Sequence, residues 1–272
     1  MMRKSALPGF RVTFGVTLLW VSLIVLLPLA CLAVRPWTLG LAGVWRSVTE
    51  PRVLAALRLS FGEAALAAVV NLPLGLLIAW VMVRYRFPMR GLADSLIDLP
   101  LALPTAVAGI ALTALFSPKG WIGALLVPLG IKVDYTPLGI LVALIFVGLP
   151  FVVRTLEPVI MDLPLDAEEA AATLGASRLQ TIYKVVLPAL LPALLAGYGA
   201  ALARGVGEYG SVIFIAGNMP MISEIAPLLI VIRLEQVDYA GAAALGLVML
   251  LASFAILLLL NLLEARMATR SP

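Results

Sequence analysis

The 272-residue sequence contains no histidine, a single cysteine at Cys31, and only 12% charged residues. Without histidine, the chain cannot form an HExxH zinc site or a histidine-based catalytic triad. A single cysteine allows no intrachain disulfide, so cysteine usage does not indicate the compartment. The sequence has neither a GxSxG element nor a GxxxxGK[ST] phosphate loop. We therefore expect no catalytic residue and no metal site, and any ATP hydrolysis must come from another chain.

Apolar residues dominate instead, because 62% of the sequence is hydrophobic and the mean hydropathy is +1.10. Spanning a bilayer takes about 20 apolar residues in a helix. Six uncharged runs reach or approach that length: Val12–Val34, Ala64–Val83, Leu99–Phe116, Pro137–Val153, Val185–Ala203 and Tyr239–Leu263. The sequence therefore predicts an all-α integral membrane protein of about six transmembrane helices.

The first of these runs also has features of a signal peptide, since Arg3, Lys4 and Arg11 precede it. Its uncharged stretch is longer than the roughly 7–15 residues of a signal-peptide core, and no clear small-x-small cleavage site follows. We interpret it as a helix that is retained.

Lysine and arginine residues are distributed unevenly between the two sides that these helices predict. With the N-terminus inside, eleven lie inside and seven outside, while Arg204 lies in or near a helix. The inside set is Arg3, Lys4, Arg11, Arg84, Arg86, Arg90, Arg154, Arg178, Lys184, Arg266 and Arg270; the outside set is Arg35, Arg46, Arg52, Arg58, Lys119, Lys132 and Arg233. This bias favours a cytoplasmic N-terminus and a cytoplasmic C-terminus.

The chain divides into three parts on this interpretation. Residues 1–58 hold one helix and an outer loop with two tryptophans, residues 59–264 hold the other five helices, and residues 265–272 form a cytoplasmic tail. Residues 209–232 are apolar enough for a seventh helix, which would move the C-terminus outside. We expect a re-entrant or surface excursion there instead, because glycine and proline interrupt it. No internal repeat is evident, which indicates that the chain forms half of an assembly.

The largest predicted cytoplasmic loop, 154–188, contains the polar segment EAAATLGASRLQTIYKVVLP. Asp166 precedes Glu169 by three residues, which resembles a capping box and predicts a short helix that ends near Leu174. Gly175 then supplies a left-handed stop.

Ser177 and Gln180 form a second capping box, so a second helix is expected to start at once and to enter the membrane near Pro188. Ala170 and Ala171 lie on one face of the first helix, where small side chains allow another protein to approach closely. An alternative is an amphipathic loop on the lipid headgroups, but anionic lipids would repel its glutamates. The segment therefore favours a role in docking.

This segment resembles the signature E-A-A-x3-G-x9-I-x-L-P of the permease subunits of bacterial ABC importers. Here it comprises Glu169, Ala170, Ala171, Gly175, Val185, Leu187 and Pro188, with valine for isoleucine as the one departure. The resemblance implies a type I importer permease fold in the bacterial cytoplasmic (inner) membrane. It also implies that the loop docks into a separate ATPase subunit, which uses ATP and Mg²⁺. The ATPase-coupling residues would be Glu169, Ala170, Ala171, Leu174, Gly175, Leu187 and Pro188.

Longer stretches at 98–112, 136–159, 207–220 and 224–250 look like the T-type (U-type) permeases of sulfate/thiosulfate importers. That resemblance implies a heterodimer with a W-type permease and an extracytoplasmic substrate-binding protein, in contact with membrane lipids and not with nucleic acid. Molybdate permeases share the loop signature and a GEFG-like segment, so molybdate or another oxyanion remains an alternative substrate.

Charged residues near the membrane are few, and Arg204 and Glu208 share a helix face at i,i+4. They either pair with each other structurally, or Arg204 lines the route of a dianion, to which a guanidinium offers two parallel hydrogen bonds. Asp94 and Asp98 are explained by helix-dipole and headgroup placement. A membrane-embedded enzyme is a different class of function, but no carboxylate pair within the membrane supports it.

Overall fold

The computed structural model describes residues 9–268, which form helices connected by turns, with no β-strand among them. The all-α prediction is confirmed. The helices are α1 (Phe10–Val21), η1 (Ser22–Leu26), α2 (Leu27–Val34), η2 (Arg35–Leu39), α3 (Gly40–Thr49), α4 (Pro51–Arg84), α5 (Arg90–Ile97), α6 (Leu99–Ala102), α7 (Thr105–Phe116), α8 (Gly123–Leu126), η3 (Val127–Leu129), α9 (Pro137–Asp162), α10 (Leu165–Thr173), α11 (Arg178–Thr181), η4 (Ile182–Val186), α12 (Leu187–Val206), α13 (Gly210–Ala216), α14 (Ala226–Glu235) and α15 (Tyr239–Ala268). Arg3, Lys4 and Arg270, used in the charge count, lie outside the described residues.

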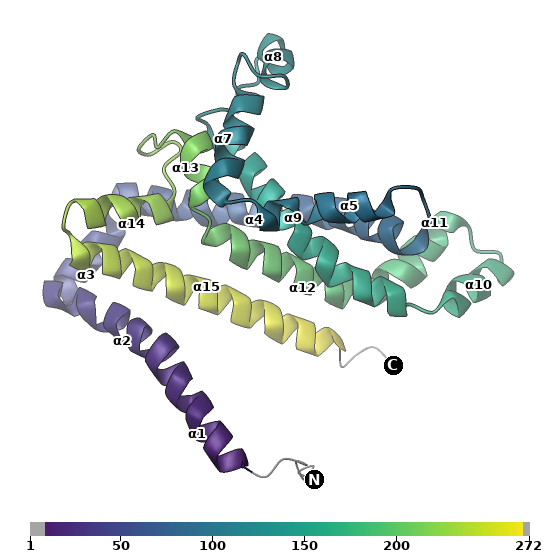
Figure 1. Cartoon of the computed structure of the whole chain (residues 1–272), viewed down its shortest axis with the longest axis horizontal. Helices are drawn as coiled ribbons and strands as arrows, with labels where there is room; N and C mark the ends of the chain where they lie inside the picture. The colour runs from purple at the N-terminus through teal and green to yellow at the C-terminus, as the bar shows by residue number, and fades with distance from the viewer. Residues whose placement is uncertain (1–8, 269–272) are drawn as a thin grey trace.

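The long helices α4, α9, α12 and α15 lie side by side and form the body of the molecule (Figure 1). Glycines bring α4 and α9 close together. A Cβ at Gly75 would lie 2.6 Å from Val152 Cγ1, and one at Gly148 would lie 2.7 Å from Asn71 Nδ2. The Asn71 amide donates to the Ile145 carbonyl at 3.2 Å. The contact between α4 and α9 therefore depends on small residues and includes an interhelical hydrogen bond, as is usual between membrane helices.

Five helical segments of the described chain are long and apolar enough to cross a membrane: Val12–Thr49, Pro51–Arg84, Pro137–Asp162, Arg178–Val206 and Tyr239–Arg266. They correspond to five of the six predicted spans. The remaining one, Leu99–Phe116, is interrupted. Leu103 is extended before Pro104, since proline disfavours the helical conformation of the residue before it. The 12-residue α7 then stands across the bundle with α8 at its tip (Figure 1).

The segment after the first helix is helical, and so the prediction of a loop there is wrong. Residues 35–49 form η2 and α3, and α4 already begins at Pro51, a residue favoured in the first helical turn. No single helix covers 209–232, as expected, because α13 and α14 have 7 and 10 residues and Gly217 is left-handed between them, while the re-entrant or surface course stays a prediction. Neither is long enough to cross a bilayer.

Two long helical segments contain a π-helical turn that is separated from a following proline by one leucine. η1 is followed by α2 with Pro28, and η4 is followed by α12 with Pro188. A proline ring inside a helix clashes with the carbonyl four residues earlier and cannot donate to it. The wider turn accommodates that clash without ending the helix, so Arg178–Val206 continues from the polar segment into the bundle.

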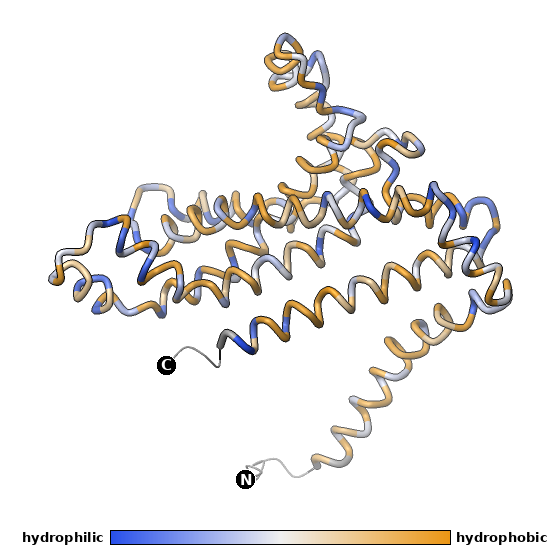
Figure 2. Tube along the Cα trace, turned by 180° about the vertical axis from the view of Figure 1, so that it is seen from behind, coloured by the Kyte–Doolittle hydropathy of each residue, from blue (hydrophilic) through white to orange (hydrophobic). Residues whose placement is uncertain are grey.

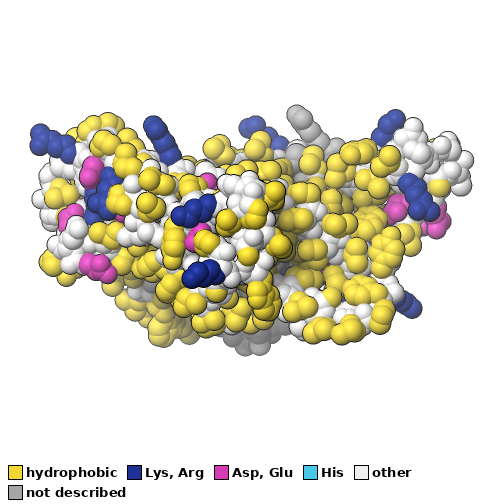
Figure 3. Space-filling view, turned by 90° about the horizontal axis from the view of Figure 1, so that it is seen from above, with side chains coloured by type: hydrophobic (Ala, Val, Ile, Leu, Met, Phe, Trp, Pro, Cys, Tyr) yellow, Lys and Arg dark blue, Asp and Glu magenta, His cyan; other side chains and the backbone are white. Residues whose placement is uncertain are grey.

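Apolar side chains cover most of the surface. Orange, hydrophobic residues follow the long helices in Figure 2, and the face seen in Figure 3 is mostly hydrophobic. Of the described residues in α1 and α2, none is buried, and α1 diverges from the rest of the bundle (Figure 1). Such a surface requires lipid or other membrane helices around it.

Candidate functional site

The polar segment 169–188 begins within α10, a short helix at one end of the bundle (Figure 1), and continues through α11 and η4. The helix α10 begins at Leu165 with Pro164 as its N-cap, and no side chain caps it. The capping box predicted for Asp166 and Glu169 is therefore wrong. The N-cap is Pro164 and not Asp166, so the helix starts two residues earlier than predicted, and this places Asp166 inside the first turn. There its charge and that of Glu168 complement the helix dipole.

The C-terminal end of α10 is as predicted, because Gly175 has φ +80°. The Gly175 amide donates to the Ala172 carbonyl and the Ala176 amide donates to the Ala171 carbonyl, each at 3.0 Å. This pair of bonds is the Schellman motif, which satisfies the last carbonyls of a helix. A Cβ at Gly175 would meet no atom within 4 Å, so the backbone angle alone is what requires glycine.

The second capping box is confirmed. The Gln180 amide donates to Ser177 Oγ at 3.4 Å, and the Ser177 amide donates to Gln180 Oε1 at 2.8 Å. α11 begins directly after this cap and leads through η4 into α12. The turn between α10 and α11 is thus fixed on both sides.

Arg84, at the end of α4, holds the start of α10. Its guanidinium donates to Glu168 Oε1 at 3.0 Å and to the Leu163 carbonyl at 3.2 Å, and it lies 5.2 Å from the centroid of the Trp80 ring. Sequence reasoning used Arg84 only as a topology marker. No local pattern connects residues this far apart in the chain, so the contact was missed.

The seven predicted coupling residues occupy two places. Glu169, Ala170, Gly175 and Leu174 are exposed on α10 and its turn, and the Leu174 side chain is 87% exposed. Ala171 is partly covered. Leu187 and Pro188 lie at the start of α12, after η4, and η4 contacts α10. The exposed group therefore forms a small surface at the bundle end, and the other two residues connect that surface to a membrane helix.

Arg204 and Glu208 form an ion pair, with Arg204 Nη1 2.5 Å from Glu208 Oε2. The other carboxylate oxygen of Glu208 accepts from the Ser211 amide and hydroxyl, each at 2.9 Å. Through these two hydrogen bonds the Glu208 side chain caps the start of α13. The Glu208 side chain is buried, whereas the Arg204 side chain is 31% exposed. Of the two alternatives for these residues, the structure shows the pairing, and the Arg204 side chain remains partly exposed.

α7 crosses α13 at two close contacts near this pair. A Cβ at Gly109 would lie 2.3 Å from the Ser211 carbonyl oxygen, and one at Gly210 would lie 2.0 Å from Thr105 Oγ1. The crossing is possible only because both helices have glycine there. It joins α7, the element that stands across the bundle, to the segment that carries Glu208.

Asp94 and Asp98 are not explained by dipole and headgroup placement, because both bind Arg154 of α9. Arg154 lies 2.7 Å from an Asp94 oxygen and 2.6 Å from an Asp98 oxygen. Glu157, on α9 itself, also lies 2.7 Å from the guanidinium. A pocket of about 340 Å³ adjoins this group and is lined also by Arg90.

At the opposite end of the bundle, arginines bind together elements that are distant in sequence. Arg52 makes two hydrogen bonds, of 2.7 and 2.6 Å, to the buried carboxylate of Glu224. Arg233 binds Glu50 at 2.9 Å and the Ser47 hydroxyl at 2.5 Å. These contacts connect α3, α4 and α14. Each pair has one buried partner, whose charge would be left uncompensated if the other partner were removed.

Comparison with known proteins places the chain among transport components. Residues 71–269 match the family described as binding-protein-dependent transport system inner membrane component. The sulfate transport system permease protein CysT of Salmonella typhimurium is 48% identical over 267 residues, which cover 98% of this chain and 96% of that protein. The CysT protein of Synechococcus elongatus is 48% identical over 248 residues, which cover 91% and 89% of the two chains.

Among solved structures, a bacterial alginate ABC transporter in complex with an alginate pentasaccharide-bound periplasmic protein contains a similar chain. The TM-score is 0.74 at 19% identity, and the match covers 93% of each chain. At that identity the likeness concerns the fold alone, and it confirms the predicted type of importer permease fold.

Proposed function

The chain belongs to the binding-protein-dependent transport system inner membrane components, and from that premise we propose that it forms half of an ATP-driven pathway for sulfate or thiosulfate. As a permease of this family it is a multi-pass inner membrane protein and not itself an enzyme. It works with other components of the transporter, among which the ATPase is a separate chain.

The observation that carries the coupling part of this proposal is the geometry of α10. The helix is short, fixed at its C-terminal end by a Schellman motif, anchored to α4 through Arg84, and exposed at Leu174. Such an element moves as a unit when another protein holds it. We assign the ATPase contact to Glu169, Ala170, Ala171, Leu174 and Gly175, with Leu187 and Pro188 carrying the movement into α12.

The proposed substrate follows from the named relatives, which are sulfate transport permeases at nearly half identity over almost the full chain. The proposed partners are a second permease of the W type, ATPase subunits and an extracytoplasmic binding protein. Uptake of labelled sulfate by cells that express the complete system tests the substrate. We expect excess unlabelled thiosulfate to compete and molybdate to compete far less; the reverse order would favour the molybdate alternative.

The orientation in the membrane is part of the proposal. The charge count places α10 in the cytoplasm, and the C-terminal part of α15 lies toward the α10 end of the bundle (Figure 1). Reporter fusions after Arg90 and after Lys184 should report the cytoplasm, and a fusion after Lys132 should report the exterior. An exterior signal after Lys184 would contradict any contact between α10 and a cytoplasmic ATPase.

Arg204 is the residue we propose for the anion path, since its side chain remains partly exposed beside Glu208. Arg204→Leu should lower sulfate uptake roughly tenfold or more while the complex still assembles, because a hydrogen bond to a charged group contributes about 1.5–3 kcal/mol. Uptake per assembled complex is the measurement.

The matched control is the double variant Arg204→Leu with Glu208→Gln. Loss of the arginine alone also leaves the buried Glu208 carboxylate without its ion-pair partner, and the glutamine removes that charge. The path role predicts that the double variant is as defective in uptake as the single one. Recovery of uptake in the double variant would show that Arg204 serves only to neutralise Glu208.

A further inference from the structure

Arg154 attaches α5 and α6 to the bundle. It donates to Asp98 through two parallel hydrogen bonds, from Nε to Oδ1 at 2.9 Å and from Nη2 to Oδ2 at 2.6 Å. Nη1 donates to Asp94 Oδ1 at 2.7 Å. Of the described residues of α5 and α6, none is buried, so apolar packing holds these helices weakly. Two-pronged arginine–carboxylate pairs fix orientation as well as adding energy.

The contact of Arg154 with Asp94 and Asp98 joins two stretches of chain, one of which leads to α10 and the other to α7. On α9, Arg154 lies about two helical turns before Asp162, where the helix ends and the chain passes into α10. On the other side, α6 continues through Leu103 and Pro104 into α7, which crosses α13 at Gly109. The arginine therefore stands between the docking helix and the crossing beside the Arg204–Glu208 pair.

We infer that Arg154 is a positioning residue for transport, which makes α5 and α6 follow α9 when the ATPase displaces α10. The movement then reaches α7 and its crossing with α13. This inference rests on the proposed function and adds to it the route by which displacement reaches the anion path. Asp94 and Asp98 lie on one face of the chain at i,i+4, so both carboxylates meet the same guanidinium.

The ion pairs of Arg154 with Asp94 and Asp98 are too exposed to act mainly by stabilising the fold. Asp94 and Asp98 are about half exposed, with side chains 50% and 45% accessible, and ion pairs at such exposure add little to stability. Removal of the arginine should therefore leave the fold and the assembly intact. Removal of Arg154 should, however, disconnect α5 and α6 from α9, since these helices have little apolar packing to hold them.

The test uses the complete complex in proteoliposomes, with its second permease, ATPase and binding protein. We expect Arg154→Gln to lower the ratio of sulfate imported to ATP hydrolysed about tenfold, within the range of coupling between sites in other proteins. Asp98→Asn should act in the same direction, since it breaks the two-pronged bond.

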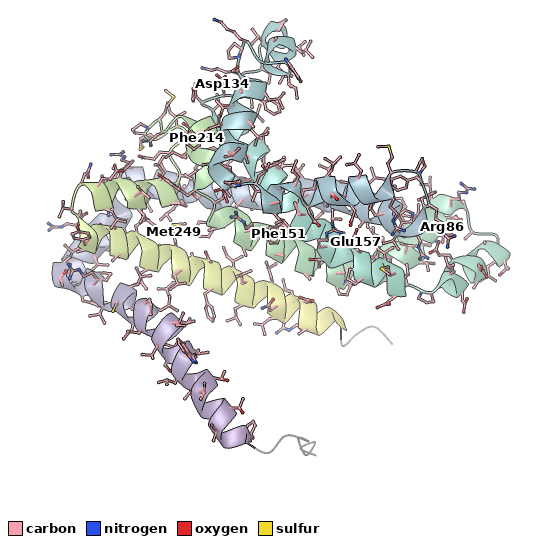
Figure 4. All side chains as sticks on the ribbon, in the orientation of Figure 1. Arg86, Asp134, Phe151, Glu157, Phe214 and Met249 are labelled. Carbon is pink, nitrogen blue, oxygen red and sulfur yellow. The ribbon has the colours of Figure 1, made fainter. Side chains whose placement is uncertain are left out.

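Glu157→Gln is the matched control (Figure 4 labels Glu157). Glu157 bonds the same guanidinium at 2.7 Å but lies on α9 with it, so this bond connects no second helix. Its loss should leave the ratio at the parental value. A ratio that falls equally for Glu157→Gln, or that does not fall for Arg154→Gln, overturns the inference.

A second measurement does not depend on transport. Spin labels on cysteines introduced at Ser95 of α5 and Asp162 of α9, with Cys31 replaced by serine, report the distance between these helices. We expect one narrow distance distribution with and without ATP in the parent, and a broad one in Arg154→Gln. Equal distributions in both would overturn the inference. If the parental complex imports no sulfate, the proposed substrate is wrong, while the distances still decide the role of Arg154.

Discussion

Replacement of Gly175 by valine is expected to abolish sulfate uptake while the chain stays in the membrane at its parental level. Gly175 has φ +80°, a conformation that β-branched residues resist, at a backbone cost on the order of 1–3 kcal/mol. No atom lies within 4 Å of a Cβ at this position, so the cost arises from the angle alone. It falls on the turn between α10 and α11 and not on the membrane bundle.

As a result, the proposed contact between α10 and the ATPase should fail, because α10 would tilt relative to α11. ATP hydrolysis by the complex should no longer respond to loaded binding protein. Gly175→Asn is the control, since asparagine tolerates the left-handed conformation, and it should retain most of the uptake. Parental uptake in Gly175→Val, or disappearance of that variant from the membrane as its only defect, would contradict the account.

Gly109→Ala is expected to have the second large effect, although it adds a single methyl group. That methyl carbon would lie 2.3 Å from the Ser211 carbonyl oxygen and 2.8 Å from Ser211 Cα. Backbone cannot rotate away as a side chain can, so α7 and α13 must separate. Overpacking of this kind costs about 1–3 kcal/mol, and here it disturbs the helix start that Glu208 caps.

Sulfate uptake should therefore be lost or fall sharply, and the purified chain should unfold at a lower temperature. Gly199→Ala is the matched control, because the nearest atom to a Cβ there is Leu260 Cδ1 at 3.6 Å, an ordinary contact. Alanine is also the better helix former, so Gly199→Ala should unfold at the parental temperature or above. Equal melting temperatures for the two variants would contradict the close crossing.

The spans and the polar segment could be predicted because their causes are local. Apolar runs of bilayer length identify α4, α9, α12 and α15, and short-range hydrogen bonding determines the left-handed Gly175 and the Ser177 cap. The first N-cap differs from the prediction by two residues, since Pro164 occupies that position and not Asp166. Exact helix ends are sensitive to such choices.

The remaining features arise from contacts between distant residues. Asp98 and Arg154 are 56 residues apart, and Arg52 and Glu224 are 172 apart, so no periodic pattern connects them. The turn of α7 away from the bundle also depends on the close approach of Gly109 to the Ser211 backbone of α13. Two prolines near Leu103 explain the break that the structure shows there, but they do not determine the direction in which the chain continues.

The most direct test of the account measures labelled sulfate in sealed proteoliposomes that hold this chain, its partner permease and the ATPase, with loaded binding protein on one side. ATP and Mg²⁺ are supplied only on the side that carries α10. The account predicts uptake that requires ATP, stops when the ATPase is omitted, and stops with Gly175→Val. Sulfate entry that is equally fast without ATP or without the ATPase would contradict it.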